Sequence, residues 1–128
     1  MTYNYPVDFK EALQTFIAQS LEEDLGTGDI SGLACLNPYA RGTAVCIIKQ
    51  SGILAGVEMA RLIFKQYDPS LEFTPLLSDG SAVEKGVIAF KVSGAQAAIL
   101  ATERLVLNCM QRMSGIATLT QEAQALIN

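Results

Sequence analysis

Residues 95–113 constrain the fold most strongly, because they have the pattern of a helix that is apolar on nearly every side. Such a helix must be covered all round, by other elements of the chain or by a partner chain. Glu103 and Arg104 nevertheless lie in its middle. Removing a guanidinium group from water is costly unless an anion pairs with it. We therefore expect Arg104 to have either an internal acidic partner or an anionic ligand.

The composition limits the possible partners and location. The chain has 128 residues, half of them hydrophobic, which suits one compact domain whose apolar surface also meets another domain or subunit. The net charge is −4 without any basic run, so we expect no nucleic-acid partner. No apolar run approaches the roughly 20 residues that span a bilayer, so we expect no membrane contact. Three cysteines without a C-x-x-C motif indicate reduced thiols and a cytoplasmic location.

The chain contains no histidine. This excludes a Ser–His or Cys–His nucleophile pair and a histidine-ligated metal within these residues. We expect neither a catalytic residue nor a metal site in this segment, and no turnover from it alone.

The periodicity predicts an α+β fold, with a small, mostly antiparallel sheet packed by helices. Helices are expected over residues 9–25, 57–67 and 95–113, and strands over 42–50, 53–54, 72–77 and 87–92. Ser114-Gly115 is expected to end the long apolar helix, and a second helix then runs to residue 128. An apolar stripe on that last helix has nothing after it to cover it, so we expect the N-terminal piece of a longer protein. The stripe consists of Ile116, Leu119, Ala123 and Ile127.

Two further motifs have structural interpretations. The acidic run from Glu22 to Asp29 contains G-x-G, but its carboxylates would repel a phosphate, so it predicts a helix end and an acidic turn. The D-G-x-x-V-x-x-G pattern that starts at Asp79 resembles the hammerhead hairpin of biotinyl and lipoyl carriers. Neither Lys85 nor Lys91 stands where a carrier lysine would, so a structural hairpin is favoured.

The charged residues of the long helix leave two possibilities open. Arg104 either forms an ion pair, with Asp29 or with an acid of another subunit, or clamps a carboxylate or phosphate with its planar fork. Glu103 also needs a partner and is assigned a structural role. Arg112 lies near the predicted helix end, where we expect it to interact favourably with the helix dipole and to be exposed to solvent.

Five motifs in this order resemble the N-terminal domain of quinolinate phosphoribosyltransferase, the carboxylating nicotinate-nucleotide pyrophosphorylase. They are Glu23-Asp24-Leu25-Gly26-x-Gly28-Asp29, Gly52-Ile53-Leu54-Ala55-Gly56-Val57-Glu58, Asp79-Gly80-x-x-Val83-x-x-Gly86, Glu103-Arg104-x-x-Leu107-Asn108 and Ser114-Gly115-Ile116-Ala117-Thr118. They cover nearly the whole chain. The family's G-D-x-T-S is Gly28-Asp29-Ile30-Ser31-Gly32 here, which departs from the pattern in that loop.

The resemblance implies an enzyme that transfers phosphoribosyl from phosphoribosyl pyrophosphate to quinolinate with Mg²⁺, releasing CO₂ and pyrophosphate and giving nicotinate mononucleotide. Residues 1–113 would be its N-terminal α/β sandwich, with a sheet of hammerhead type. Residues 114–128 would begin the connection into a C-terminal α/β barrel. That barrel would carry most of the active site and would provide most of the contacts to Mg²⁺. Arg104 matches the arginine that reaches across the homodimer into the neighbour's barrel and holds a substrate carboxylate.

Two alternatives stay open at this point. One is a phosphoribosyltransferase-like protein of the same fold with a different substrate, of the molybdenum-transport-associated type. The other is a non-catalytic hammerhead interaction module. The sequence beyond residue 128 would distinguish this same-fold protein from a quinolinate phosphoribosyltransferase. A lysine-linked cofactor would indicate a carrier.

Overall fold

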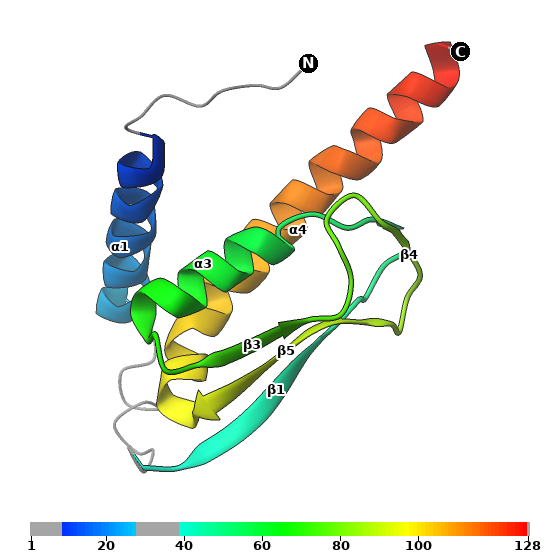
Figure 1. Ribbon diagram of the computed structural model, residues 1–128. Helices are drawn as coiled ribbons and strands as arrows, with labels where there is room; N and C mark the ends of the chain where they lie inside the picture. The colour runs from blue at the N-terminus through cyan, green and yellow to red at the C-terminus, as the bar shows by residue number, and fades with distance from the viewer. Residues whose placement is uncertain (1–8, 28–38, 128) are drawn as a thin grey trace.

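The computed structural model describes residues 9–27 and 39–127 (Figure 1). In chain order the elements are α1 (Phe9–Thr27), β1 (Arg41–Ile47), β2 (Gly52–Ile53), α3 (Val57–Tyr67), β3 (Glu72–Pro75), β4 (Ala82–Val83), β5 (Ile88–Ala95) and α4 (Gln96–Ile127). Within these residues no helix is both long and apolar enough to cross a bilayer.

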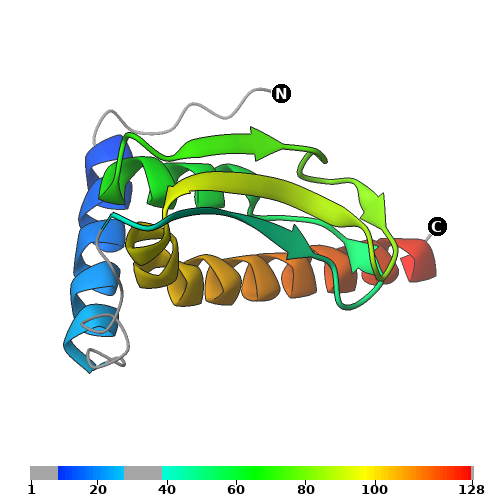
Figure 2. The ribbon, with the colours of Figure 1, turned by 90° about the horizontal axis from the view of Figure 1, so that it is seen from below.

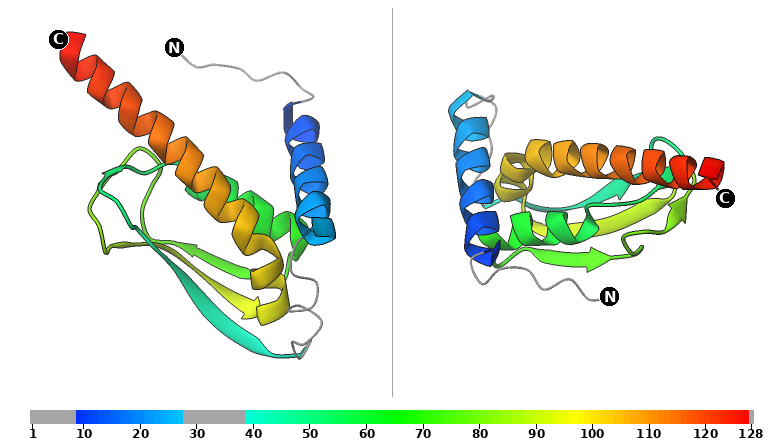
Figure 3. Two further views of the ribbon diagram at one scale, coloured as in Figure 1. Left: turned by 180° about the vertical axis from the view of Figure 1, so that it is seen from behind. Right: turned by 90° about the horizontal axis from the view of Figure 1, so that it is seen from above.

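The strands form a three-stranded antiparallel sheet in the order β1-β5-β3, and β2 pairs with β4 in a separate two-stranded ribbon. Helices α3 and α4 lie on the same face of the larger sheet, and α1 lies beside the start of α4 (Figures 1 and 2). Burial alternates along β1, as expected for a strand with one covered and one open face. The last turns of α4 extend beyond the sheet (Figure 3).

The core lies between the sheet and the two helices. Phe64 of α3, Phe73 of β3 and Phe90 of β5 form an aromatic cluster with ring centroids 4.9 to 5.9 Å apart. These separations are those of tilted and edge-to-face pairs, which add to the stabilisation from apolar burial. Ile63 and Val106 are buried beside this cluster and join α3 to α4. The helices are therefore fixed on the sheet by large apolar side chains.

The N-terminus of α3 is capped by a residue from a distant turn. Its N-cap, Gly56, has no side chain to accept a hydrogen bond. The carboxylate of Asp79 accepts the backbone N–H of Val57 at 2.8 Å and that of Glu58 at 3.2 Å. Gly80 and Gly86 in the segment that contains this turn have positive φ angles of 90° and 99°. Asp79 therefore has a structural role, but the predicted hairpin is not formed, because β4 pairs with β2 whereas β5 pairs with β1 and β3.

We predict that Asp79→Ala destabilises the domain by about 1–2 kcal/mol, because it leaves two helix N–H groups without an acceptor. Urea unfolding followed by circular dichroism measures the change. Asp79→Asn is the control, since its amide oxygen retains one acceptor, and it should lose about half as much. Equal losses in the two variants would show that the hydrogen bonds are not the source of the effect.

The coarse sequence prediction is confirmed, since the fold combines helices with a small antiparallel sheet. Helix α1 begins at Phe9 as predicted and continues to Thr27, two residues past the predicted end. The predicted break at Ser114-Gly115 is wrong, because α4 is continuous through both residues. Strand β4 was not predicted, and β5 continues to Ala95.

Candidate functional site

Helix α4 buries only one side along the predicted functional segment. Its buried residues are Ala98, Ile99, Ala101, Thr102, Leu105, Val106 and Met110. On the other side Leu100 and Leu107 are 47% and 40% exposed, and Glu103 and Arg104 are exposed between them. Among the described residues, α3, α1 and the sheet reach only one face of this helix, so other described elements supply only part of the expected cover, and cover by a partner chain stays a prediction.

Arg104 lies on the exposed face of α4. Among the described residues the structure contains one ion pair, between Arg61 and Glu58 on α3, so Arg104 has no acidic partner there. Asp29, the predicted internal partner, lies outside the described residues. The guanidinium group is thus solvated rather than desolvated by this part of the fold. A side chain in this position is free to bind an anion brought from outside.

The sequence also assigned roles to Glu103 and Arg112 on α4. Glu103 is exposed, so the described fold does not require a structural partner for it. Arg112 is exposed to solvent as predicted, but it is not near a helix end, because α4 continues to Ile127. Arg104 and Arg112 are therefore two solvent-facing arginines on one helix.

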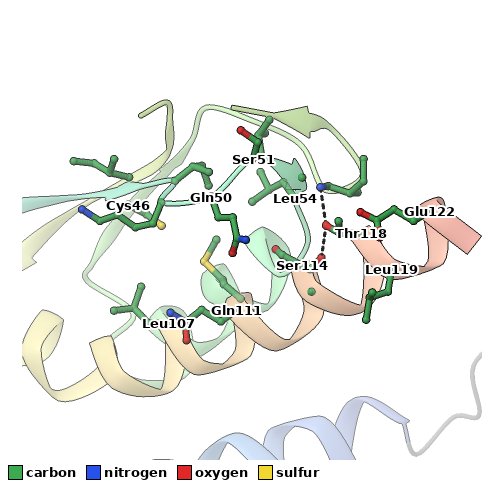
Figure 4. A pocket seen from close by; sticks show the side chains of 18 residues that line it. Cys46, Gln50, Ser51, Leu54, Leu107, Gln111, Ser114, Thr118, Leu119 and Glu122 are labelled. Atoms are coloured by element: carbon green, nitrogen blue, oxygen red, sulfur yellow. Dashed lines mark hydrogen bonds between the residues drawn. The ribbon is translucent and has the colours of Figure 1, made fainter. Parts of the chain in front are cut away.

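A groove of about 600 Å³ lies between α4 and residues 46–54 (Figure 4). On the α4 side it begins at Leu107, one turn after Arg104, and continues through Gln111. Its opposite wall includes Cys46 at the end of β1. Burial raises the pKa of the Cys46 thiol, so this sulfur is protonated at neutral pH. The groove is therefore mostly apolar, and Lys49 and Glu122 are the charged residues that line it.

Two hydroxyl groups of α4 hold the wall of this groove in place (Figure 4). The Ser114 hydroxyl donates to the carbonyl oxygen of Ala55 and accepts its N–H, both at 2.9 Å. The Thr118 hydroxyl accepts the N–H of Ile53 at 3.0 Å and donates to the carbonyl oxygen of Ser114. Sequence reasoning missed these roles, although an S-x-x-x-T spacing on one helix face was the available signal.

The remaining sequence candidates do not join this site. The acidic run that starts at Glu22 falls partly in α1, and its last residues lie outside the described part of the chain. Lys85, in the turn between β4 and β5, and Lys91, on β5, are both exposed. Within residues 9–27 and 39–127, no group of three or more Cys, Asp or Glu side chains is arranged to hold a metal ion.

Comparison with known proteins identifies the family. Residues 29–114 match the model of the quinolinate phosphoribosyl transferase N-terminal domain. A nicotinate-nucleotide pyrophosphorylase [carboxylating] of Oryza sativa is 46% identical over 110 residues, which are 85% of this chain and 30% of that protein. A probable nicotinate-nucleotide pyrophosphorylase [carboxylating] of Synechocystis is 37% identical over 110 residues, which are 86% of this chain and 37% of that protein.

The fold comparison agrees with the sequence comparison. The structure of the nicotinate-nucleotide pyrophosphorylase from Francisella tularensis superimposes with a TM-score of 0.84 at 32% identity, over 97% of this chain and 42% of that one. The chain spans about a third of the length of the curated relatives. The matched region includes α3, the sheet and the first half of α4 with Arg104. The chain therefore belongs to the quinolinate phosphoribosyl transferase N-terminal domain family.

Proposed function

We propose that this domain works in an enzyme of NAD biosynthesis that transfers phosphoribosyl from phosphoribosyl pyrophosphate to quinolinate. The transfer releases pyrophosphate, and decarboxylation of the resulting pyridine nucleotide, in which a proton replaces the lost carboxylate, gives nicotinate mononucleotide and CO₂. The names of the relatives support this activity, and the match over residues 29–114 is the observation that carries it. The enzyme is a phosphoribosyltransferase, and the domain contributes substrate binding rather than a catalytic residue.

In this proposal Arg104 binds a carboxylate of quinolinate in the barrel of the neighbouring subunit of a homodimer. The side chain is exposed on α4 and has no acidic partner among the described residues, so it does not have to break an ion pair in order to bind. Its planar fork matches a carboxylate with two parallel hydrogen bonds. The flanking Leu100 and Leu107 are exposed apolar groups that a partner surface would cover. Once covered, they would exclude water around the charge pair and strengthen it.

The proposal also assigns the remaining parts of the enzyme. Residues 1–113 form the N-terminal domain, with a hammerhead-type sheet, and residues 114–128 lead toward an α/β barrel. We assign Mg²⁺, which would neutralise the charge of pyrophosphate, mainly to that barrel, as the resemblance implies. The location is cytoplasmic, without a nucleic-acid or membrane partner, whereas the Oryza sativa relative is named as chloroplastic.

We predict that the 128-residue chain has no turnover by itself. A chimaera in which this chain replaces the matched 42% of the Francisella tularensis protein is expected to form nicotinate mononucleotide from quinolinate and phosphoribosyl pyrophosphate. Liquid chromatography of the product measures the rate, and circular dichroism checks that both proteins are folded. Turnover by the 128-residue chain, or a folded chimaera that binds but does not convert quinolinate, would contradict the proposal.

A further inference from the structure

The backbone of residues 53–55 is hydrogen-bonded along both of its edges. In an antiparallel strand the polar backbone groups of successive residues point to opposite edges. On one edge the N–H of Leu54 donates to the carbonyl oxygen of Ser81 at 2.9 Å, and the Leu54 carbonyl oxygen accepts the N–H of Gly80 at 2.7 Å. This edge therefore continues the pairing of β2 with β4.

The other edge faces α4, whose hydroxyl groups take the place of a third strand (Figure 4). Thr118 accepts the N–H of Ile53, and Ser114 accepts the N–H of Ala55 and donates to its carbonyl oxygen. The fit is close, because a Cβ on Gly52 would lie only 2.6 Å from the hydroxyl oxygen of Thr118. Ser114 and Thr118 are four residues apart and so lie on one face of the helix. The helix is therefore joined to this edge by specific hydrogen bonds.

These hydrogen bonds are the main attachment of the second half of α4 to the described residues. The first half, as far as Met110, buries apolar residues against α3 and the sheet. Within residues 111–126 all residues are exposed except Ser114, Ala117 and Thr118, which are partly buried. Apolar burial is non-directional, whereas hydrogen bonds have a defined distance and angle. The direction of the second half of α4 is therefore set mainly by two hydroxyl groups.

We propose that Ser114 and Thr118 are positioning residues for quinolinate binding. Arg104 lies on the half of α4 that is packed on the domain, and residues 114–128 are proposed to lead toward the barrel. The two hydroxyl groups would thus fix the angle between the domain and the barrel of the same chain. That angle would determine where Arg104 meets the substrate carboxylate, and a misplacement of about 1 Å can cost roughly 100-fold. This inference rests on the proposed function.

Steady-state kinetics of the full-length enzyme test the positioning role. A double variant, Ser114→Ala with Thr118→Val, is expected to raise the quinolinate KM at least about tenfold. The KM for phosphoribosyl pyrophosphate should not change, because the pyrophosphate group is assigned to the barrel. Thr118→Ser alone keeps the hydroxyl group and should retain the wild-type KM for quinolinate. A double variant with the wild-type quinolinate KM would overturn the inference.

Thr120→Val is the matched control on the same helix. The Thr120 hydroxyl donates to the carbonyl oxygen of Ile116 at 2.8 Å, within α4 itself. Its loss removes a threonine hydroxyl without loosening the attachment of α4 to residues 53–55. The quinolinate KM should therefore stay at the wild-type value. Equal increases for Thr120→Val and the double variant would overturn the inference.

Asp79→Ala separates positioning from a general loss of stability. It also removes hydrogen bonds from the domain, but these bind the N-terminus of α3 rather than α4. Well below its melting temperature it should change the quinolinate KM less than about twofold. If Asp79→Ala raises this KM as much as the double variant does, stability is the cause and the positioning role is wrong.

Hydrogen exchange with mass spectrometry observes the attachment itself. In the double variant of the full-length enzyme, the N–H groups of Ile53 and Ala55 lose their acceptors. A peptide that covers residues 52–56 should then exchange at least about tenfold faster than in the wild type. Exchange at the wild-type rate would show that the hydroxyl groups do not hold α4 to this edge.

The two proposals fail in different ways. If the wild-type enzyme forms nicotinate mononucleotide while the double variant keeps the wild-type quinolinate KM, the positioning role is wrong and the proposed function stands. If the wild-type protein converts no quinolinate while the double variant exchanges faster at residues 52–56, the proposed function is wrong. The positioning role then falls with it, and only the attachment of α4 stands.

Discussion

Replacing Arg104 with alanine in the full-length enzyme is expected to raise the KM for quinolinate about 100-fold or more. A charge-assisted, bidentate contact that is covered by a partner surface is worth about 3 kcal/mol, and its loss leaves the substrate carboxylate unpaired. The melting temperature should change little, because Arg104 is exposed and forms no ion pair with a described residue. Steady-state kinetics with phosphoribosyl pyrophosphate at saturation measure the effect.

Arg112→Ala is the matched control for this prediction. Arg112 is a second exposed arginine on α4, so its removal changes the net charge of the chain by the same amount. Eight residues rotate it by about 80° away from Arg104 around the helix. Arg104→Lys keeps the charge but loses the planar fork, and should recover only part of the affinity. A lower melting temperature for Arg104→Ala with an unchanged quinolinate KM would instead indicate an internal ion pair.

The sequence predicted a role for Arg104 by an argument of which the structure contradicts one part, the burial of the whole helix by the described residues. A charge within a nearly apolar helix pointed to an anion, but the same pattern overstated how much of α4 this chain buries. Leu100 and Leu107 contribute to the apolar pattern and are nevertheless exposed. Hydrophobic periodicity shows that a residue suits a covered surface, and it does not show whether the covering surface belongs to the same chain.

Elements that depend on local pattern were predicted well, and elements that depend on distant contacts were not. Strand β1 alternates along its length and α3 repeats its apolar residues at helical spacing, so both were found. The Ser114-Gly115 pair has a local preference for a helix end, but Ser114 is held by Ala55, which is 59 residues earlier in the chain. That tertiary contact, together with helical backbone on both sides, outweighs a weak local preference.

The largest expected loss of stability comes from Gly56, which connects β2 to α3. Its φ of 98° is strained for any residue with a side chain, and a Cβ would lie 3.0 Å from the Cα of Met110 on α4. We predict that Gly56→Ala destabilises the domain by about 2–4 kcal/mol, from backbone strain and from displacement of α4 together. Urea unfolding measures the loss of stability. Substitution of Gly56 by residues larger than alanine is expected to reduce the yield of folded protein.

Gly86→Ala separates the two causes of this effect. Gly86 has nearly the same φ, 99°, but a Cβ there would meet nothing within 4 Å. Its replacement should therefore cost only the backbone strain, about 1–2 kcal/mol. The difference between the two variants measures the close packing of the β2–α3 connection against α4. That packing sets the position of the helix that presents Arg104, so Gly56→Ala should also disturb the groove. If the two variants lose the same stability, α4 adjusts without cost and the close contact at Gly56 does not position it.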